Sequence, residues 1–144
     1  MTHAVTARSP APSRPVPGGD RSVPADTGVA REQLTIIEHH VGRRAVVAVA
    51  GEVDIQTAAD LQTAIETASS RALEIWVDLS DTTFMDSSGL HALVSARAHV
   101  TQASRRLSLI CPQGPVLRVL TLTWLDHLFE IYATRGTANH AITA

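Results

Sequence analysis

Two adjacent hydroxyls, those of Ser87 and Ser88, follow the carboxylate of Asp86 where a strand-like pattern changes to a helix-like pattern. The first N–H groups of a helix have no partners within the helix, and the helix dipole is positive at that end. A phosphate group is stabilised in such a position. These residues therefore indicate either a position where a phosphate group would be stabilised or an ordinary helix cap, in which Asp86 or Ser87 accepts hydrogen bonds from the helix backbone.

The segments on either side of the serines predict a strand followed by a helix. In residues 73–79 an aliphatic side chain occupies every second position and alternates with Glu74, Trp76 and Asp78, as is typical of a strand. Residues 90–102 instead follow a spacing of three and four, which predicts a helix with one buried face. We expect one face of this helix to carry Leu90, Leu93, Val94, Arg97, Ala98 and Thr101, and the other His91, Ser95, His99 and Gln102.

An acidic turn follows an earlier strand. Residues 45–50 are all aliphatic and predict that strand, which Gly51-Glu52-Val53-Asp54 closes. Thr57 is expected to cap the next helix, with Asp60 three residues later as in a capping box. The buried face of that helix is predicted to contain Leu61, Ala64, Ile65 and Ala68.

The remaining patterns predict an α/β fold. Residues 34–37 indicate a first strand, and the segment 39–44 is expected to turn the chain into the second as a hairpin. Further predicted elements are a strand at 107–110, a helix that starts at Gly114-Pro115, a strand at 128–132 and a short helix at 137–144. The order ββαβαβαβα favours a mixed, mostly parallel sheet packed with about four helices.

The first part of the chain differs in composition from the rest. Residues 1–31 contain five of the seven prolines and almost no large apolar residues, so we expect a disordered tail. Residues 32–144 are expected to form a single domain.

Composition excludes several classes of function. The formal net charge of −2 provides no general attraction for nucleic acid or for an anionic membrane. No apolar run approaches the length of a membrane span, and the N-terminus lacks the apolar core of a signal peptide, so we expect a soluble cytoplasmic protein. Cys111 is the only cysteine, so no intrachain disulfide can form, and we expect it to be buried at the end of a strand.

Enzymatic and metal sites are not indicated. His39 and His40 lack a third ligand at a recognisable spacing, so neither a metal nor a cofactor is expected. A hydrolase nucleophile elbow needs glycine two residues before and after the serine, but Met85 precedes Ser87. The chain contains no lysine, which excludes a Walker phosphate-binding loop. We therefore predict that the protein is not an enzyme.

The heptapeptide Phe84-Met-Asp-Ser-Ser-Gly-Leu90 resembles the signature of the STAS domain, specifically of the bacterial anti-sigma factor antagonists. The turn Gly51-Glu-Val-Asp54 is similar to the turn that lies beside the phosphorylation site in that family. The resemblance runs from about residue 33 to about residue 140. It implies that Ser87 is the phosphorylated residue, and that the partner-binding residues are Glu52, Asp54, Asp86, Ser87, Ser88 and Gly89.

The resemblance also implies a function. In this family the unphosphorylated protein binds an anti-sigma factor that is also a serine kinase, and this binding releases the sigma factor for transcription. The kinase then phosphorylates the serine, and a serine phosphatase restores it. Contact with nucleic acid, insertion into a membrane and a cofactor are not implied, and no oligomeric state is indicated. We expect helix N–H groups to stabilise the phosphate in the free domain.

The resemblance also allows an alternative function. STAS domains also serve as unphosphorylated subunits beside a transporter ATPase or within stress-signalling scaffolds.

Family members often have glycine where this chain has Trp124, which places the conformation of that turn in question. Core packing is the default expectation for a lone Trp, and an exposed aromatic anchor is the alternative.

Overall fold

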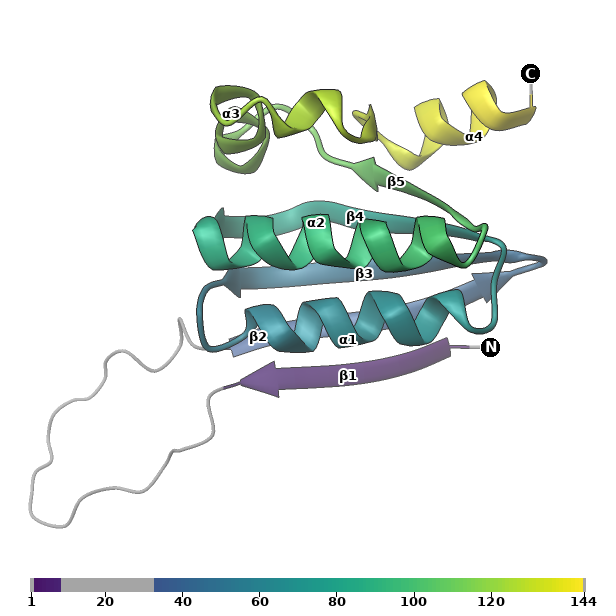
Figure 1. Ribbon diagram of the computed structural model, residues 1–144, viewed down its shortest axis with the longest axis horizontal. Helices are drawn as coiled ribbons and strands as arrows, with labels where there is room; N and C mark the ends of the chain where they lie inside the picture. Colours follow the sequence, from purple (N-terminus) through teal and green to yellow (C-terminus); the bar gives the residue numbers. More distant parts are fainter. Residues whose placement is uncertain (1, 9–32, 144) are drawn as a thin grey trace, which may run out of the picture.

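A computed structural model describes residues 2–8 and 33–143, with side chains described for residues 34–140. The described part forms six strands, four α-helices and one short 3-10 helix (Figure 1). In chain order they are β1 (Thr2–Arg8), β2 (Gln33–Val41), β3 (Arg44–Val53), α1 (Ala58–Ser69), β4 (Glu74–Met85), α2 (Ser87–Gln102), β5 (Arg106–Ile110), α3 (Pro115–Leu122), η3 (Leu125–His127), β6 (Glu130–Tyr132) and α4 (Arg135–Thr143). From β2 onward the order ββαβαβαβα is confirmed.

The strands lie in the sheet in the same order as in the chain, from β1 to β6. The pairs β1–β2 and β2–β3 are antiparallel, whereas β3–β4, β4–β5 and β5–β6 are parallel. Right-handed crossovers that always advance in one direction place their helices on one face of a sheet. Accordingly, α1, α2 and α3 follow one another across the sheet in Figure 1.

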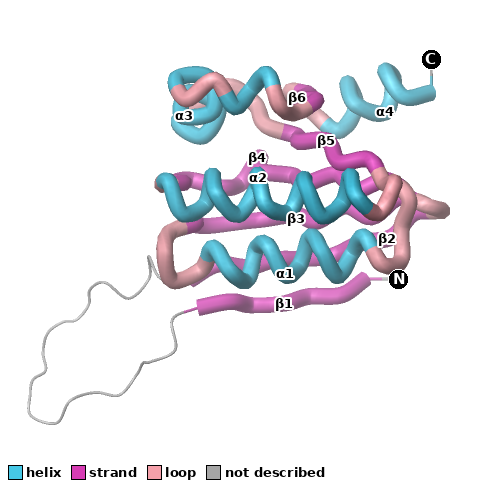
Figure 2. The backbone as a smooth tube through the Cα atoms, in the orientation of Figure 1, coloured by secondary structure: helices cyan, strands magenta, loops and turns pink. Residues whose placement is uncertain are grey.

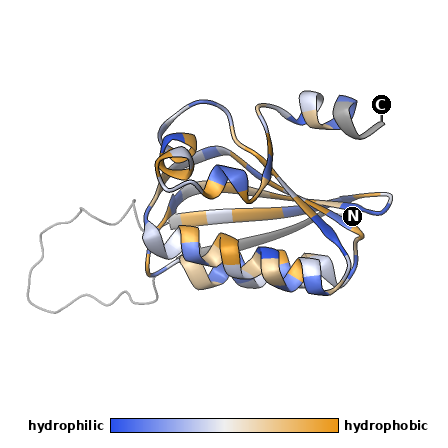
Figure 3. Cartoon of the chain, turned by 45° about the horizontal axis from the view of Figure 1, so that its top comes forward, coloured by the Kyte–Doolittle hydropathy of each residue, from blue (hydrophilic) through white to orange (hydrophobic). Residues whose placement is uncertain are grey.

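The main hydrophobic core lies between this helical layer and the sheet. It includes fully buried residues from the strands and from all three helices, among them Ile36, Val77, Leu61, Leu93 and Leu120. In Figure 3 the central strands are largely orange, whereas the helices carry both orange and blue residues. This two-sided pattern is the amphipathic pattern expected of helices that cover a sheet.

A smaller core lies on the opposite face of the sheet. Trp76 is 2% exposed there and packs with Val46, Ile110 and Ala138, the last of which belongs to α4. The guanidinium of Arg44 stacks over the Trp76 ring at 3.9 Å from its centroid. Both faces of the middle strands are therefore covered. This explains why Trp76 is buried although its side chain lies on the face of β4 opposite the main core.

The β2–β3 hairpin is confirmed, but its turn is shorter than predicted. His39 and His40 lie within β2, and only Gly42 and Arg43 form the turn. Gly42 has a φ of +61°, a left-handed conformation that glycine adopts without strain.

The predicted buried face of α2 was partly wrong. The helix buries Gly89, Leu90, Ala92, Leu93, Ala96 and Val100, while Ala98 and Thr101 are exposed. The error has a physical cause. The prediction relied on the larger side chains to identify the buried face, whereas α2 packs the small residues Gly89, Ala92 and Ala96 against the rest of the domain.

The N-terminal segment also differs from the prediction. Residues 2–8 were expected to be disordered, but they form β1, an edge strand paired with β2 from Thr2 opposite His39 to Arg8 opposite Gln33. The nonlocal pairing with β2, which local composition does not encode, accounts for this error. The rest of the expected tail, residues 9–31, lies outside the described residues.

Two further predictions concern the second half of the chain. Cys111 is buried directly after β5, as expected, and Pro115 is the first residue of α3. Core packing of Trp124 was wrong, because its side chain is 72% exposed and its φ is +65°. Trp124 thus adopts the left-handed conformation at the position where the family pattern has glycine. No helix within the described residues is long and apolar enough to cross a bilayer.

Candidate functional site

The carboxyl ends of β3 and β4 lie side by side because the two strands are parallel. Val53 pairs with Met85, and the Asp86 N–H donates to the Val53 carbonyl at 3.2 Å. The loop that leads into α1 and the start of α2 therefore occupy the same end of the sheet (Figure 2). This arrangement brings together the two acidic segments that the sequence singled out, Glu52–Asp54 and Asp86–Ser88.

Asp86 caps the N-terminus of α2. Its backbone is extended, and its Oδ1 accepts hydrogen bonds from the N–H groups of Ser88 at 2.8 Å and Gly89 at 3.2 Å. The Leu90 N–H donates to the Asp86 carbonyl at 3.1 Å. The expectation that helix N–H groups are available to a phosphate is therefore corrected: the Asp86 carboxylate already occupies two of them.

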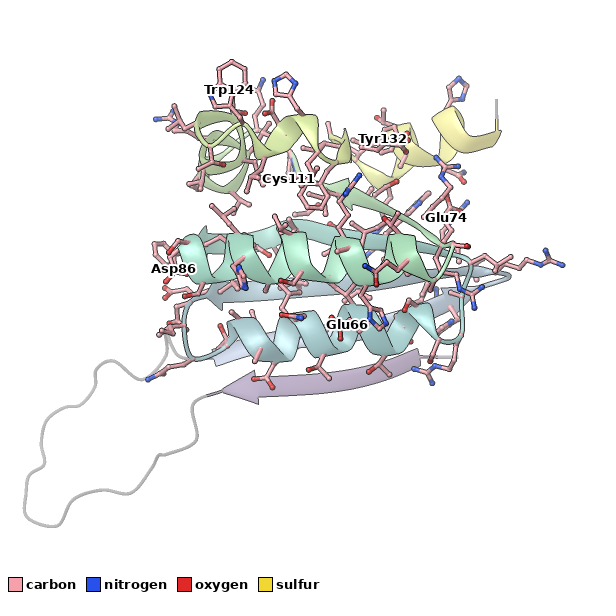
Figure 4. All side chains as sticks on the ribbon, viewed as in Figure 1. Glu66, Glu74, Asp86, Cys111, Trp124 and Tyr132 are labelled. Atoms are coloured by element: carbon pink, nitrogen blue, oxygen red, sulfur yellow. The ribbon has the colours of Figure 1, made fainter. Side chains whose placement is uncertain are left out.

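Ser87 is the first residue of α2 and its side chain is exposed, whereas Ser88 is half-buried. Within residues 34–140, neither hydroxyl makes a side-chain hydrogen bond. The Ser87 hydroxyl is consequently accessible to a modifying enzyme without any rupture of internal contacts. Figure 4 shows Asp86, next to Ser87 in the chain, at the end of the molecule where β4 stops.

Asp54 has a similar local role in the loop before α1. Its Oδ1 accepts hydrogen bonds from the N–H groups of Gln56 at 2.9 Å and Thr57 at 3.2 Å. Thr57 does not cap α1 through its side chain, so the predicted capping box with Asp60 was wrong. Instead, the buried Thr57 hydroxyl accepts from the Asp54 N–H at 3.0 Å and donates to the Glu52 carbonyl at 3.1 Å. The turn from Glu52 to Thr57 is thus held by its own polar groups.

Gly89 fixes the distance between α2 and the two strand ends. A Cβ atom at this position would lie 2.6 Å from Met85 Cγ and 2.8 Å from Val53 Cγ1. Such separations are well below van der Waals contact, so only glycine lets the helix start this close to the ends of β3 and β4. Because Gly89 is buried, it supports the site from beneath.

An open depression lies between the first turns of α1 and α2, beside Ser87. The residues that line it are Ile55, Ala58, Ala59, Gln62, Ser87, Ser88, His91 and Ala92. Sequence reasoning missed Ile55, which is 78% exposed, although an aliphatic residue between Asp54 and Thr57 in a polar loop was a usable signal.

The charge of this end of the molecule is negative. Glu52, Asp54, Asp60 and Asp86 belong to the two segments 52–60 and 84–92, which contain neither lysine nor arginine. Within these two segments, the only ionisable group that can become positive is the imidazole of His91. A further negative charge at Ser87 would thus meet repulsion from its own surroundings.

The geometry of Ser87 does not resemble that of a catalytic nucleophile. Its hydroxyl forms no hydrogen bond to a histidine within residues 34–140, and the His91 Nε2 lies 3.5 Å from the Ser95 hydroxyl. A serine nucleophile needs a base within hydrogen-bond reach. In the described part of the chain, no group of three or more His, Cys, Asp or Glu side chains could hold a metal ion.

Two perturbed groups lie away from this end, near α4. Burial raises the pKa of the Cys111 thiol to about 11, and the negative charge of Asp78 adds to the effect. Burial also tends to raise the pKa of Asp78, but hydrogen bonds from the Ser80 hydroxyl and N–H and from Arg135 outweigh it, so the pKa is lowered. Cys111 is consequently a protonated, unreactive thiol at neutral pH.

The family model for the STAS domain matches residues 34–138. A curated relative, the anti-sigma-B factor antagonist of Listeria monocytogenes, is 30% identical over 92 residues, which cover 63% of this chain and 81% of that protein.

Solved structures share the fold. A crystal structure of an anti-sigma factor antagonist from Mycobacterium paratuberculosis has a TM-score of 0.70 at 27% identity, and the match covers 77% of this chain and 95% of that one. SpoIIAA in its unphosphorylated form has a TM-score of 0.62 at 20% identity, covering 76% of this chain and 97% of that one. Bacillus SpoIIAA in the phosphorylated form gives 0.57 at 19% identity, with 74% and 98% covered.

Proposed function

Because this chain belongs to the STAS domain family and, within it, to the anti-sigma factor antagonists, we propose that its unmodified form binds an anti-sigma factor that is also a serine kinase. Phosphorylation of Ser87 by that kinase ends the binding, and a serine phosphatase restores it. The supporting observation is the position of Ser87, whose exposed, unbonded hydroxyl stands at the start of α2 on an acidic surface. The protein acts through protein contacts in the cytoplasm, without catalysis and without contact with nucleic acid.

The switch is electrostatic. A phosphate on Ser87 adds about −1.5 to −2 charges at neutral pH. It stands next to the Asp86 carboxylate, and the Ser88 and Gly89 N–H groups, which would have neutralised part of its charge, are already bonded to Asp86. The segments 52–60 and 84–92 offer no lysine or arginine to compensate. A partner surface that fits the unmodified acidic end therefore meets excess negative charge and added bulk.

The fold supports this switch without having to change. Asp86 caps α2 in the unmodified domain, and within residues 34–140 the Ser87 hydroxyl has no internal hydrogen bond to lose. SpoIIAA, which shares this fold, exists in an unphosphorylated and a phosphorylated form. We therefore expect the added charge to weaken the interface with the partner without unfolding the domain.

Ser87 is a better acceptor than Ser88. The Ser87 side chain is exposed, whereas Ser88 is half-buried and lies deeper in the helix, where its own N–H already binds Asp86. A kinase must extract the acceptor hydroxyl into its active site, and the first helical residue can be presented with the least local unwinding.

The test is incubation of the purified full chain with the anti-sigma factor kinase and ATP, followed by mass spectrometry to locate the phosphate. One phosphate on Ser87 is expected. Ser87→Ala should abolish the modification and Ser88→Ala should preserve it. Phosphate on Ser88 alone would overturn the residue assignment. Stable binding to the anti-sigma factor that Ser87→Asp does not weaken would instead support the role of a permanent, unphosphorylated subunit.

A further inference from the structure

A groove runs along α3 on the side of the candidate site that faces away from α1. Its first part lies between the end of β4 and the start of α3 and is lined by Phe84, Met85, Gly114, Pro115, Arg118 and Val119. Its second part continues along α3 and is lined by Gln113, Gly114, Leu117, Arg118, Thr121 and Leu122. Gly114 and Arg118 belong to both parts, so the two form one surface, which we call the α3 groove.

The α3 groove begins at the candidate site. Phe84 and Met85 directly precede Asp86 and Ser87 in the chain, and Phe84 is 46% exposed. Figure 1 shows α2 between α1 and α3, so the depression between α1 and α2 and the α3 groove flank the start of α2 on its two sides. A protein that docks over Ser87 therefore lies close to the first part of the α3 groove, because Phe84 lines that part and is three residues before Ser87 in the chain.

The far end of the groove leads to two exposed apolar side chains. Leu122, the last residue of α3, and Trp124 are each 72% exposed. Among residues 34–140, the indole of Trp124 stacks only on His127, with ring centroids 5.2 Å apart and an angle of 20° between the planes. Figure 4 shows Trp124 at the outer edge of the molecule, beyond α3.

Trp124 is unfavourable in the isolated domain on two grounds. Its left-handed conformation strains a residue with a Cβ atom, and glycine would avoid that strain. Its indole also leaves most of its apolar surface in water. Strained backbone and exposed large aromatics both occur where a surface binds a partner, and Trp is among the commonest residues to dominate such contacts.

The α3 groove carries a positive charge, whereas the end of the molecule around Ser87 is negative. The Arg118 guanidinium forms no ion pair or side-chain hydrogen bond within residues 34–140, although it is exposed and surrounded by apolar neighbours. The complement of a lone guanidinium in an apolar groove is a carboxylate flanked by apolar side chains, since Arg binds carboxylates through paired hydrogen bonds.

We propose that the α3 groove, together with Leu122 and Trp124, is a second contact surface for the anti-sigma factor, and that it holds an apolar segment of that partner with a carboxylate opposite Arg118. This inference rests on the proposed function. The acidic surface around Ser87 and the positive charge of Arg118 lie side by side. A partner with complementary charges can therefore bind in only one orientation. The α3 groove thereby positions the kinase over Ser87 and is itself left unchanged by phosphorylation.

The test is isothermal titration calorimetry of full-length variants. The probe is the anti-sigma factor whose binding to the unmodified chain is weakened by Ser87→Asp. Arg118→Glu is expected to weaken binding at least about tenfold, because it places a carboxylate against the partner's carboxylate. The matched control is Arg43→Glu, which makes the same change of charge in the β2–β3 turn at the opposite end of β3.

A second variant tests the apolar part of the contact. Trp124→Gly is expected to weaken binding by about tenfold, as for a central aromatic contact, while it relieves backbone strain and so keeps the protein folded. Ser104→Gly is its control, because Ser104 also has a left-handed backbone, with a φ of +62°, and lies after the C-terminus of α2. Both controls should bind within about twofold of the unmodified chain, an affinity difference of less than about 0.5 kcal/mol.

The outcomes separate this inference from the proposed function. If Arg118→Glu binds as tightly as Arg43→Glu, and Trp124→Gly as tightly as Ser104→Gly, while Ser87→Asp still weakens binding, the inference is overturned and the proposed function stands. If no anti-sigma factor binds the unmodified chain in a manner that depends on Ser87, the proposed function fails, and the inference fails with it.

Discussion

The carboxylate of Asp86 determines what a phosphate on the neighbouring serine can do. Because its Oδ1 accepts from the Ser88 and Gly89 N–H groups, the start of α2 is already satisfied when Ser87 is unmodified. The capping role of Asp86 was predictable from the sequence, since Asp before a helical pattern is a common cap. The competition between Asp86 and a phosphate was not, because it depends on where the carboxylate points.

Gly89 provides a residue-scale prediction. Replacement of glycine by alanine inside a helix normally stabilises it by about 0.5–1 kcal/mol. At Gly89 the added methyl group would meet Met85 and the stiff side chain of Val53 at less than 3 Å, so we expect Gly89→Ala to lower the free energy of unfolding by about 1–3 kcal/mol. Urea denaturation followed by circular dichroism measures the change.

The matched control for Gly89→Ala is Gly136→Ala in α4. A Cβ atom there meets only the Thr134 hydroxyl at 3.7 Å, an ordinary contact. This variant should be neutral or stabilising. Equal effects of the two substitutions would show that the packing of α2 on the strand ends does not require glycine.

At the scale of elements, most local signals predicted the structure correctly, with the exception of the capping box at Thr57 and Asp60. The hairpin turn at Gly42, the start of α3 at Pro115 and the burial of Cys111 after β5 each depend on a few neighbouring residues. The features that the sequence did not disclose are nonlocal. They are the pairing of β1 with β2, the choice of small residues as the buried face of α2, and the exposure of Trp124.

The strand β1 leads to a prediction about the sheet edge. Without residues 2–32, β2 becomes an edge strand with unpaired backbone groups, which favour exchange with solvent and association with other chains. We expect a variant with this deletion to show faster amide hydrogen exchange in β2, with little change in α2. Hydrogen exchange with mass spectrometry provides the measurement, and unchanged exchange in β2 would argue that β1 does not protect this edge in solution.

The attachment of α4 depends on pH. Asp78 in β4 accepts a hydrogen bond from Arg135, the first residue of α4, and the pKa of Asp78 is lowered from its ordinary value of 3.8. A lowered pKa means that the folded state favours the carboxylate. This contribution to stability is therefore present above the ordinary pKa and is lost as pH falls through the lowered one.

Asp78→Asn tests this dependence. The variant should have a lower free energy of unfolding than the unmodified chain at pH 7, and the difference should shrink as the pH falls below about 4. Chemical denaturation at pH 7 and pH 3 provides the comparison. A difference that does not vary with pH would show that the lost contact is not electrostatic.

At the scale of the whole molecule, the order of the sheet explains how a small domain could present the proposed switch. The carboxyl ends of parallel strands lie at the same end of the sheet. The turn after β3, the start of α2 and the start of α3 are therefore all at that end (Figure 1). The resemblance to the antagonist family implied that the first two would meet. It did not predict that Arg118 of α3 would line a groove next to Phe84, since that depends on how α3 packs across the sheet.

The central claim is that a single phosphate on Ser87 decides whether the domain binds its anti-sigma factor while the fold is retained. The most direct measurement is the affinity of that factor for the full chain in its unmodified form and in its Ser87-phosphorylated form, by titration calorimetry, with circular dichroism of both forms as the control for folding. We expect phosphorylation to weaken binding at least about tenfold, which corresponds to about 1.4 kcal/mol or more, with unchanged secondary structure. Equal affinities of the two forms would contradict the account.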